Sequence, residues 1–322
     1  MDRKLALEIV RITEAGAIAS SAWIGRGDKH GADEAATSAM RKMLDSVPIK
    51  GTVVIGEGEM DEAPMLYIGE QVGSGFGPAV DVAVDPLEGT ESVANGSNHG
   101  MSVIAIAERG SLLHAPDMYM KKLAVGAALA GKLSLDDPID LTLNKAARIL
   151  NKPLAELTVM ILNRSRHQDI IEVLRNHGVR IRLLEHGDVS GAMVTAIPEQ
   201  GVDMYIGSGG APEGVLAAAG LRCLGGELQG RLWVTSDEER RRCEWMGISN
   251  PDQLLCMEDM VGTGDVIFAA TGITDSDLLR GVRVLPGERI ESHSVMMRAK
   301  TGTIRYLQSV HMMPKHLKQA LG

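Results

Sequence analysis

The sequence predicts an α/β fold, and three observations lead to this class. From about residue 135 onward, apolar β-branched runs alternate with amphipathic stretches of helical period. Before that point, two helical stretches precede apolar runs that end in acidic, glycine-rich turns. The chain has 37 glycines and only 3% aromatic residues, which suits tight turns between helices and strands. Its 322 residues have room for two domains, and we place an α+β domain at 1–135 and an α/β domain at 136–322.

Two helices are expected at the N-terminus. Apolar residues recur near helical spacing over residues 2–24, and Gly25 is placed to end that helix. Residues 25–31 hold too many glycines to continue it, and the helical pattern resumes over 32–47. Asp33 lies at the start of this second helix, where an acid is favoured by the helix dipole whether or not it has a further role.

The first acidic turn follows a β-branched strand predicted at residues 52–55. The loop from Gly56 to Pro64 carries four carboxylates within six positions, namely Glu57, Glu59, Asp61 and Glu62. An exposed acidic loop is the simplest interpretation of this pattern. The glycines beside Glu57, however, keep backbone and solvent close to it, as a metal site requires.

The second acidic turn follows an apolar strand at 81–84, which we expect to end before Pro86. Asp85 and Glu88 lie at its exit, and Gly89-Thr90 opens a short polar helix. Backbone N–H groups at a helix start favour an anion such as phosphate, but nearby carboxylates repel one unless a cation bridges them. The pattern therefore favours a divalent ion such as magnesium, with an ordinary turn as the alternative.

Further strands are predicted along the rest of the chain. Residues 101–107 form a continuous apolar run, and Leu112-Leu113 and 123–125 are expected to pair nearby. Near the C-terminus, 266–270 is a predicted strand, and 294–310 a hairpin that turns at Thr301-Gly302.

The second half of the chain predicts a mostly parallel sheet. Strands are expected at 157–162, 179–184 and 203–206, with helices at 168–177 and 189–196 between them. Ligands of such sheets bind at the carboxyl ends of the strands. Three polar segments occupy these ends, and they are 163–167, 185–188 and 207–214.

Composition excludes several classes of function. The net charge is −9 and no basic cluster could follow a nucleic-acid backbone, so we expect no nucleic-acid partner. No run approaches the roughly 20 apolar residues that span a bilayer, and the N-terminus lacks a signal-peptide core. Cys223, Cys243 and Cys256 have neither zinc-site nor redox-pair spacing, so we expect buried, reduced thiols and a cytoplasmic location.

Six sequence blocks together resemble the class II, GlpX-type fructose-1,6-bisphosphatases. They occur in family order along nearly the whole chain, and they are WIGRGDK, VVIGEGEMDEAPMLYIGE, VAVDPLEGT, APDMYM, GDVSGA and GSGGAPEGV. The resemblance implies a layered α/β/α/β/α sandwich of the lithium-sensitive phosphatase superfamily. It implies hydrolysis of the 1-phosphate of fructose-1,6-bisphosphate, a gluconeogenic reaction that uses Mg²⁺ or Mn²⁺, by a homo-oligomer (dimer or tetramer).

The resemblance also assigns site residues position by position. The implied metal ligands are Asp33, Glu57, Asp85, Glu88 and Glu213, and the residues needed for activity include Lys29, Asp61 and Thr90. The implied substrate contacts are Glu88, Gly89 and Thr90 at one phosphate and Tyr119, Arg164, Ser165, Arg166, His186, Gly187, Asp188 and Gly210 along the sugar and second phosphate. By this assignment, 1–135 binds metal and phosphate and 136–322 binds the sugar phosphate.

His186 departs from the family pattern, which usually has Asp before Gly187-Asp188. Histidine can donate or accept a hydrogen bond and changes charge near pH ~6.5, whereas Asp only accepts at neutral pH. Arg164, where some relatives carry Lys, keeps its charge.

The mechanism expected is metal-assisted phosphate monoester hydrolysis. Thr90 is expected to orient the attacking water together with Glu57 or Asp61, and the sequence leaves open which carboxylate accepts the proton. Sedoheptulose-1,7-bisphosphate is an alternative or additional substrate, and an inositol phosphate a more distant one. A non-catalytic sugar-phosphate sensor is a further alternative, although it would not need the hydroxyl of Thr90.

Overall fold

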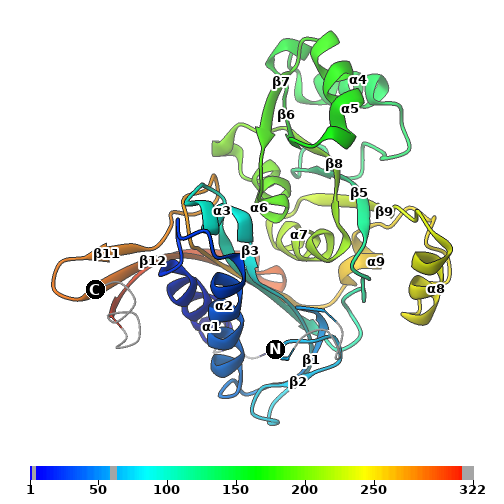
Figure 1. The fold of residues 1–322 in the computed structure, drawn as a ribbon. Helices are drawn as coiled ribbons and strands as arrows, with labels where there is room; N and C mark the ends of the chain where they lie inside the picture. The colour runs from blue at the N-terminus through cyan, green and yellow to red at the C-terminus, as the bar shows by residue number, and fades with distance from the viewer. Residues whose placement is uncertain (2–4, 59–63, 314–322) are drawn as a thin grey trace. The chain divides into compact units, whose positions relative to one another are not determined.

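The computed structural model describes residues 1, 5–58 and 64–313, and the chain forms two compact units (Figure 1). Unit 1 comprises Met1–Leu112 and Gly264–Gly322, and unit 2 comprises Leu113–Thr263. The chain therefore passes from one unit to the other twice, whereas the sequence analysis placed a single boundary after residue 135.

Unit 1 is built on an eight-stranded sheet of order β11-β12-β10-β4-β3-β1-β2, with β13 on the other edge of β12. β1 and β3 are parallel, and the other pairs are antiparallel. Its helices and strands are α1 (Leu5–Ser21), α2 (Lys29–Leu44), β1 (Lys50–Ile55), β2 (Gln71–Val72), β3 (Ala79–Glu88), α3 (Thr90–Asn95), β4 (Met101–Glu108), β10 (Val266–Gly272), β11 (Arg283–Leu285), β12 (Arg289–Arg298), the 3₁₀ turn Ala299–Thr301 and β13 (Thr303–Met312).

Helices α1 and α2 bury apolar faces in the core of unit 1. Ile9, Ile12 and Met40 belong to the same buried cluster as strand residues such as Val82 and Ile104. A Cβ on Gly16 of α1 would lie 2.6 Å from Ser102 Oγ and 2.8 Å from Met40 Cγ, so the close approach of the helix requires glycine. The two predicted N-terminal helices are thus confirmed, although α1 ends earlier than expected, at Ser21, and α2 begins and ends three residues before its predicted bounds.

Strand β3 continues through Pro86, although the sequence analysis expected it to stop there. Its pairing with β4 shifts register between Asp85 and Glu88. A bulge tolerates proline because the residue there need not donate to the neighbouring strand. Asp85 and Glu88 consequently lie on either side of this irregularity, at the end of the strand, and the short helix α3 begins at Thr90 as predicted.

Unit 2 is built on a five-stranded sheet of order β7-β6-β8-β5-β9. Its helices and strands are β5 (Tyr119–Val125), α4 (Ile139–Leu150), β6 (Thr158–Leu162), α5 (Gln168–Asn176), β7 (Arg180–Leu184), α6 (Asp188–Met193), β8 (Met204–Gly210), α7 (Ala211–Leu224), β9 (Glu227–Leu232), α8 (Asp237–Trp245) and α9 (Met257–Val261). Short 3₁₀ turns lie at Leu154–Glu156, Ser165–His167, Val194–Ala196 and Pro198–Gln200.

The strand and helix alternation predicted for unit 2 is confirmed, but the sheet is only half parallel. β6 runs parallel to β7 and β8, whereas β5 runs antiparallel to β8 and β9. The reason is that β5 precedes the alternating segment and enters its sheet beside β8. Residues 123–125 therefore belong to this sheet, and Leu112-Leu113 is not part of a strand, contrary to expectation. The α/β class is confirmed, because each unit combines a mixed sheet with helices, as the layers of an α/β sandwich do.

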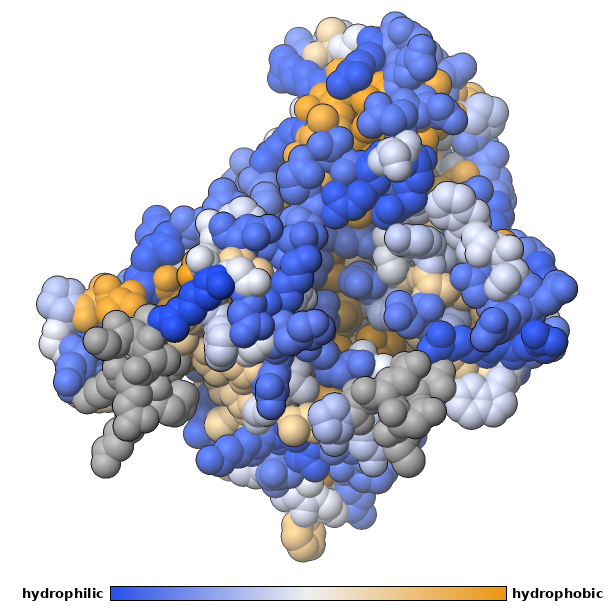
Figure 2. All heavy atoms as spheres, in the orientation of Figure 1, coloured by the Kyte–Doolittle hydropathy of each residue, from blue (hydrophilic) through white to orange (hydrophobic). Residues whose placement is uncertain are grey.

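The visible surface is largely hydrophilic, and hydrophobic residues show in two areas, near β11, where Val284 is exposed, and over the part of unit 2 that holds β6 and β7 (Figure 2). None of the helices in the described ranges has the length and apolar character that crossing a bilayer needs. Cys223 and Cys243 are buried as expected, but Cys256 is exposed, because it caps the start of α9.

Candidate active site

Three carboxylates meet in unit 1, from α2 and from the exits of β1 and β3. The Glu57 carboxyl shares a hydrogen bond with Asp33. Burial, and then the negative charges of Asp33 and Asp85, raise the pKa of Glu57 to about 9. Burial also raises the pKa of Asp33 above its ordinary value. Two strand exits far apart in the sequence thus deliver acids to one place.

Local backbone contacts fix where these acids lie. Asp28 caps α2 by accepting a hydrogen bond from Gly31 N at 2.9 Å, which sets the start of the helix that carries Asp33. Beside β1, the backbone N–H of Glu57 donates to Leu66 O at 3.0 Å. A cavity of about 360 Å³ opens here, and its lining includes His30, Asp33, Thr37, Glu57, Pro64 and Met65.

This cluster fits a hard divalent cation. Carboxylate oxygens are the ligands that magnesium and manganese prefer. Burial first, and then the charges of Asp33 and Asp85, raise the pKa of Glu57, and a bound cation would offset both effects. In the described part of the chain, no three acidic, His or Cys side chains already have the spacing of a formed metal site.

The turn after β3 places backbone and hydroxyl groups beside the acids. Asp85 Oδ1 accepts a hydrogen bond from Leu87 N at 3.1 Å, and Glu88 is buried. Gly89 has a φ of 79°, and a Cβ there would lie 2.7 Å from His99 O, so only glycine fits. Thr90 Oγ1 donates to Leu87 O at 3.1 Å, which leaves its lone pairs to accept a hydrogen bond from water.

Lys29, the first residue of α2, forms an ion pair with Glu91 of α3. The Nζ to Oε1 distance is 2.7 Å, and both side chains are about half exposed. The contact links the start of α2 to the helix that follows the Asp85 turn, so Lys29 lies beside the predicted phosphate site. Asp61 lies outside the described residues.

In unit 2, Arg166 follows β6 in a fixed orientation. Its guanidinium donates to Ser208 Oγ at 3.0 Å and Ser208 O at 2.8 Å, and it lies 4.4 Å from the centre of the Tyr119 ring. Arg164 donates to the backbone oxygens of Asn163 and Glu185 at 2.9 and 2.5 Å. Both arginines therefore lie at the carboxyl end of β6, where Arg164 reaches the segment after β7 and Arg166 reaches β8.

His167 supports Arg166, and the sequence analysis gave it no role. Its Nδ1 lies 2.8 Å from Leu162 O and must donate there, so Nε2 accepts from Ser208 N at 2.8 Å. Burial holds the pKa of this imidazole below its ordinary value, which keeps it neutral and able to accept. Its position directly after two basic residues at a strand end is the only sequence signal that could have suggested it.

Asp188 begins α6 and is held by two buried side chains. Lys122 Nζ donates to Oδ2 at 2.5 Å, and the Tyr205 hydroxyl donates to Oδ1. Lys122 is fully buried and Tyr205 is one of the largest buried side chains. A Cβ on Gly209 would lie 1.8 Å from Asp188 Oδ2, so β8 needs glycine there. Neither Lys122 nor Tyr205 was predicted, because each sits within a strand that looked merely apolar.

Glu213 lies in the first turn of α7. Its Oε2 has no hydrogen-bond partner within the described ranges. Burial raises its pKa, and the charge of Lys122 opposes that shift. A Cβ on Gly210 would lie 1.9 Å from Glu213 Oε2. A buried carboxylate oxygen without a donor is the group that a cation would satisfy.

Comparison with known proteins shows which family the chain is similar to. Residues 3–311 match the family described as bacterial fructose-1,6-bisphosphatase, glpX-encoded. The chain is 47% identical to fructose-1,6-bisphosphatase 1 class 2 of Escherichia coli strain K12, over 97% of this chain and 96% of that protein. The class 2 fructose-1,6-bisphosphatases of E. coli O6:H1 strain CFT073 and Shigella flexneri show the same identity and coverage.

The chain belongs to the class 2 fructose-1,6-bisphosphatase family. The predicted enzyme class, a phosphoric monoester hydrolase acting on fructose-1,6-bisphosphate in gluconeogenesis, is thereby confirmed. Membership of the class 2 family also implies metal-dependent catalysis.

The individual roles that the class 2 resemblance implies stay predictions. Within unit 1 the structure brings together Asp33, Glu57 and Asp85, with Glu88, Gly89 and Thr90 in the turn that begins at Asp85. Within unit 2 it places Tyr119 against Arg166, and Lys122 next to both Asp188 and Glu213. His186 is half-buried and precedes Gly187, the N-terminal cap of α6.

Proposed function

We propose that this chain hydrolyses the 1-phosphate of fructose-1,6-bisphosphate to give fructose-6-phosphate and phosphate, with Mg²⁺ or Mn²⁺ as cofactor. The observation that carries the proposal is the carboxylate cluster of Asp33, Glu57 and Asp85, in which the pKa of Glu57 rises to about 9. Such crowding of acids costs stability unless a cation is bound. The cluster also lies beside Gly89 and Thr90, which are suited to bind a phosphate, so a bound ion would be close to the phosphate that is hydrolysed.

The residues of unit 1 would hold the ion and the reacting phosphate. Asp33, Glu57, Asp85 and Glu88 would bind the metal, and Glu213 of unit 2 is the fifth proposed ligand. When bound, a divalent ion polarises phosphoryl oxygens and lowers the pKa of a coordinated water.

Protein groups would orient the attacking water and receive its proton. Thr90 Oγ1 donates to Leu87 O, and it would therefore accept from the water and fix its direction. Glu57 or Asp61 would then take the proton. Lys29, at the start of α2, would place a positive charge near the reacting phosphate, where its contact with Glu91 holds it.

The residues of unit 2 would recognise the sugar and its second phosphate. Arg166 is held by Ser208 through Nε and Nη2, which leaves the remaining N–H groups of its fork for a phosphate. Arg164, Ser165, Tyr119 and Gly210 would contribute further contacts. Asp188 keeps accepting capacity after binding Lys122 and Tyr205, so it can also accept from a sugar hydroxyl, beside Gly187 and His186.

Metal-depleted enzyme with known ion additions tests this proposal. Phosphate release from fructose-1,6-bisphosphate should be absent in chelator and return with Mg²⁺ or Mn²⁺. A coupled assay for fructose-6-phosphate should give one equivalent per phosphate, whereas release of fructose-1-phosphate would contradict the site of cleavage. Sedoheptulose-1,7-bisphosphate in competition measures whether the site accepts a longer sugar.

We also propose a cytoplasmic homo-oligomer. The absence of the spacing of a zinc or disulfide pair among Cys223, Cys243 and Cys256 supports a reducing compartment. Cys223 and Cys243 form no disulfide and are buried in the core, where oxidants reach them poorly.

A further inference from the structure

Residues 64–70 form a wall of the carboxylate site, although none of them is a predicted ligand. The first two line the cavity beside Glu57. Further along, Leu66 O accepts a hydrogen bond from the backbone N–H of Glu57 at 3.0 Å. A Cβ on Gly56 would lie 1.9 Å from Leu66 O, so the two stretches of backbone are in direct contact. The position of Glu57 therefore depends on where Leu66 is held.

Leu66 has a backbone conformation that is uncommon for leucine. Its φ is 56°, and its side chain is fully buried in the core of unit 1. Its backbone N–H donates to Glu70 Oε2. The carboxylate of Glu70 thus binds the amide of the residue whose carbonyl holds Glu57.

The other oxygen of the Glu70 carboxylate binds helix α2. Arg41 Nε donates to Oε1 at 2.5 Å, and the Arg41 and Glu70 side chains are 24% and 11% exposed. Arg41 also donates to Asp45, but that carboxylate is largely exposed, so the second contact contributes little. Glu70 therefore joins the segment beside Glu57 to the helix that carries Asp33.

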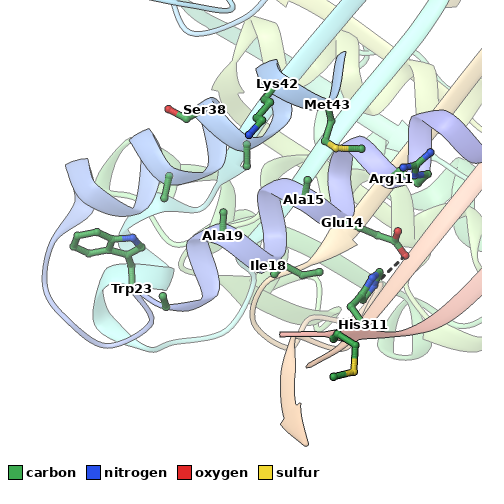
Figure 3. A pocket seen from close by; sticks show the side chains of 14 residues that line it. Arg11, Glu14, Ala15, Ile18, Ala19, Trp23, Ser38, Lys42, Met43 and His311 are labelled. Atoms are coloured by element: carbon green, nitrogen blue, oxygen red, sulfur yellow. Dashed lines mark ion pairs between the residues drawn. The ribbon is translucent and has the colours of Figure 1, made fainter. Parts of the chain in front are cut away.

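Arg41 lies on the same face of α2 as Asp33. Asp33, Thr37 and Arg41 follow one another at intervals of four residues, and the first two line the cavity beside Glu57. Lys42, one position further, instead lines a groove of about 770 Å³ beside α1 and α2 (Figure 3). The ion pair therefore lies on the face of α2 that carries the site.

We propose that Glu70 is a positioning residue for the metal site, which keeps Glu57 and Asp33 facing one another. Its two carboxylate oxygens each hold one of the two elements that carry these acids, so the loss of Glu70 releases both. Contacts of this kind, one step removed from the ligands, commonly change metal affinity by about 10- to 100-fold. The inference rests on the proposed function, because it requires that a cation binds to this cluster.

Mn²⁺ binding to the full chain, followed by the loss of the free-ion EPR signal, tests the proposal. Glu70→Ala should weaken Mn²⁺ binding by about tenfold or more, since it removes both contacts. Asp203→Ala is the matched control and should bind Mn²⁺ as the wild type does. The Asp203 side chain is 10% exposed and likewise accepts from one backbone N–H, that of Thr158, and from one basic side chain, that of Lys152, but it lies in unit 2.

Further variants separate the two contacts of Glu70. Arg41→Met removes only the link to α2 and should weaken Mn²⁺ binding by a smaller factor than Glu70→Ala. Lys42→Met loses the same charge from an exposed side chain and should bind as the wild type does. Glu70→Gln keeps an acceptor for the Leu66 N–H and should recover part of the affinity. Circular dichroism checks folding, and Arg41→Met decides the test if Glu70→Ala does not fold.

Steady-state kinetics supply a second readout. The Glu70 side chain binds Arg41 and Leu66, not a proposed substrate contact. Glu70→Ala should therefore need more Mn²⁺ for half-maximal activity, whereas its KM for fructose-1,6-bisphosphate at saturating Mn²⁺ should stay near the wild-type value. A general loss of structure would change both quantities.

The outcomes distinguish this inference from the proposed function. If the wild type binds Mn²⁺ and Glu70→Ala binds it equally tightly, the inference alone is wrong. Equal weakening in Asp203→Ala would also overturn it, because the effect would then be one of general stability. A wild type that binds no Mn²⁺ would contradict the proposed function and the role of Glu70 together.

Discussion

Glu57 is the residue at which charge and stability are most strongly linked. Its pKa is about 9 in the folded protein and 4.5 ordinarily, so the folded state favours the protonated form. The stability gained from this is complete below pH 4.5 and is lost as the pH rises toward 9. In chelator, the free energy of unfolding attributable to Glu57 should therefore fall by about 1.4 kcal/mol per pH unit in the middle of that window.

Thermal unfolding in chelator across this pH range measures the effect. Glu57→Gln, which keeps a neutral side chain at every pH, should flatten the slope. Saturating Mg²⁺ should also flatten it in the wild type, because bound metal compensates the ionised carboxylates. Equal slopes in wild type and Glu57→Gln would show that another group causes the pH dependence.

Lys122 gives a second prediction at the scale of one residue. Removal of this buried cation leaves the carboxylates of Asp188 and Glu213 without their compensating charge. Lys122→Met should therefore destabilise the protein by about 3–5 kcal/mol in denaturant unfolding and raise the KM for fructose-1,6-bisphosphate. Lys121→Met, one position along β5 on the exposed side, is the control and should change stability little. A Lys122→Met variant as stable as this control would mean that the pair with Asp188 contributes nothing.

At the scale of the element, the turn after β6 predicts how the second phosphate is recognised. Arg166 is preorganised by Ser208 and Tyr119, so Arg166→Ala should cost roughly 2–3 kcal/mol in kcat/KM for fructose-1,6-bisphosphate. Fructose-1-phosphate lacks the second phosphate and should lose much less. Steady-state kinetics on both sugars decide the matter, and the same loss on both would assign Arg166 a structural role.

Elements were predictable where local pattern alone decides them. The helix that carries Asp33 follows from apolar spacing and from the glycine-rich segment before it. The end of β3 could not be predicted in this way, because only the pairing with β4 shows the bulge that allows Pro86 within the strand. Likewise, the place of β5 in the second sheet depends on contacts with β8, which lies about 85 residues further along the chain.

Some residues of the candidate site could not be predicted from the sequence, because their partners lie far away along the chain. The acids of the turns at Glu57 and Asp85 could be identified because glycine and proline mark the strand exits. The partners of Asp188 could not, since a lysine in YMKKLAV does not reveal that its ammonium points into the core. His167 was missed for the same reason, because its contact with Ser208 spans 41 positions.

At the scale of the whole molecule, unit 1 holds a cluster of carboxylates suited to a metal ion. Unit 2 holds an arginine side chain suited to a phosphate group. Class 2 family membership covers residues 3–311, and so both units. Neither unit alone accounts for a bisphosphatase. Hydrolysis needs the metal ion that the carboxylates of unit 1 would bind, and selection of a bisphosphate needs a contact with the second phosphate, which unit 2 would supply. The two kinds of variant should therefore fail differently, with acid variants losing metal response and Arg166→Ala losing substrate discrimination.

The most direct test of the central claim is Mn²⁺ binding, measured by the loss of the free-ion EPR signal, alongside phosphate release in the same samples. Asp85→Asn should weaken Mn²⁺ binding by an order of magnitude or more and abolish phosphate release, while circular dichroism stays unchanged. Asp45→Asn, at the exposed end of α2, should match the wild type in both measurements. Wild-type Mn²⁺ binding and phosphate release in Asp85→Asn would contradict the assignment of the catalytic metal to this cluster.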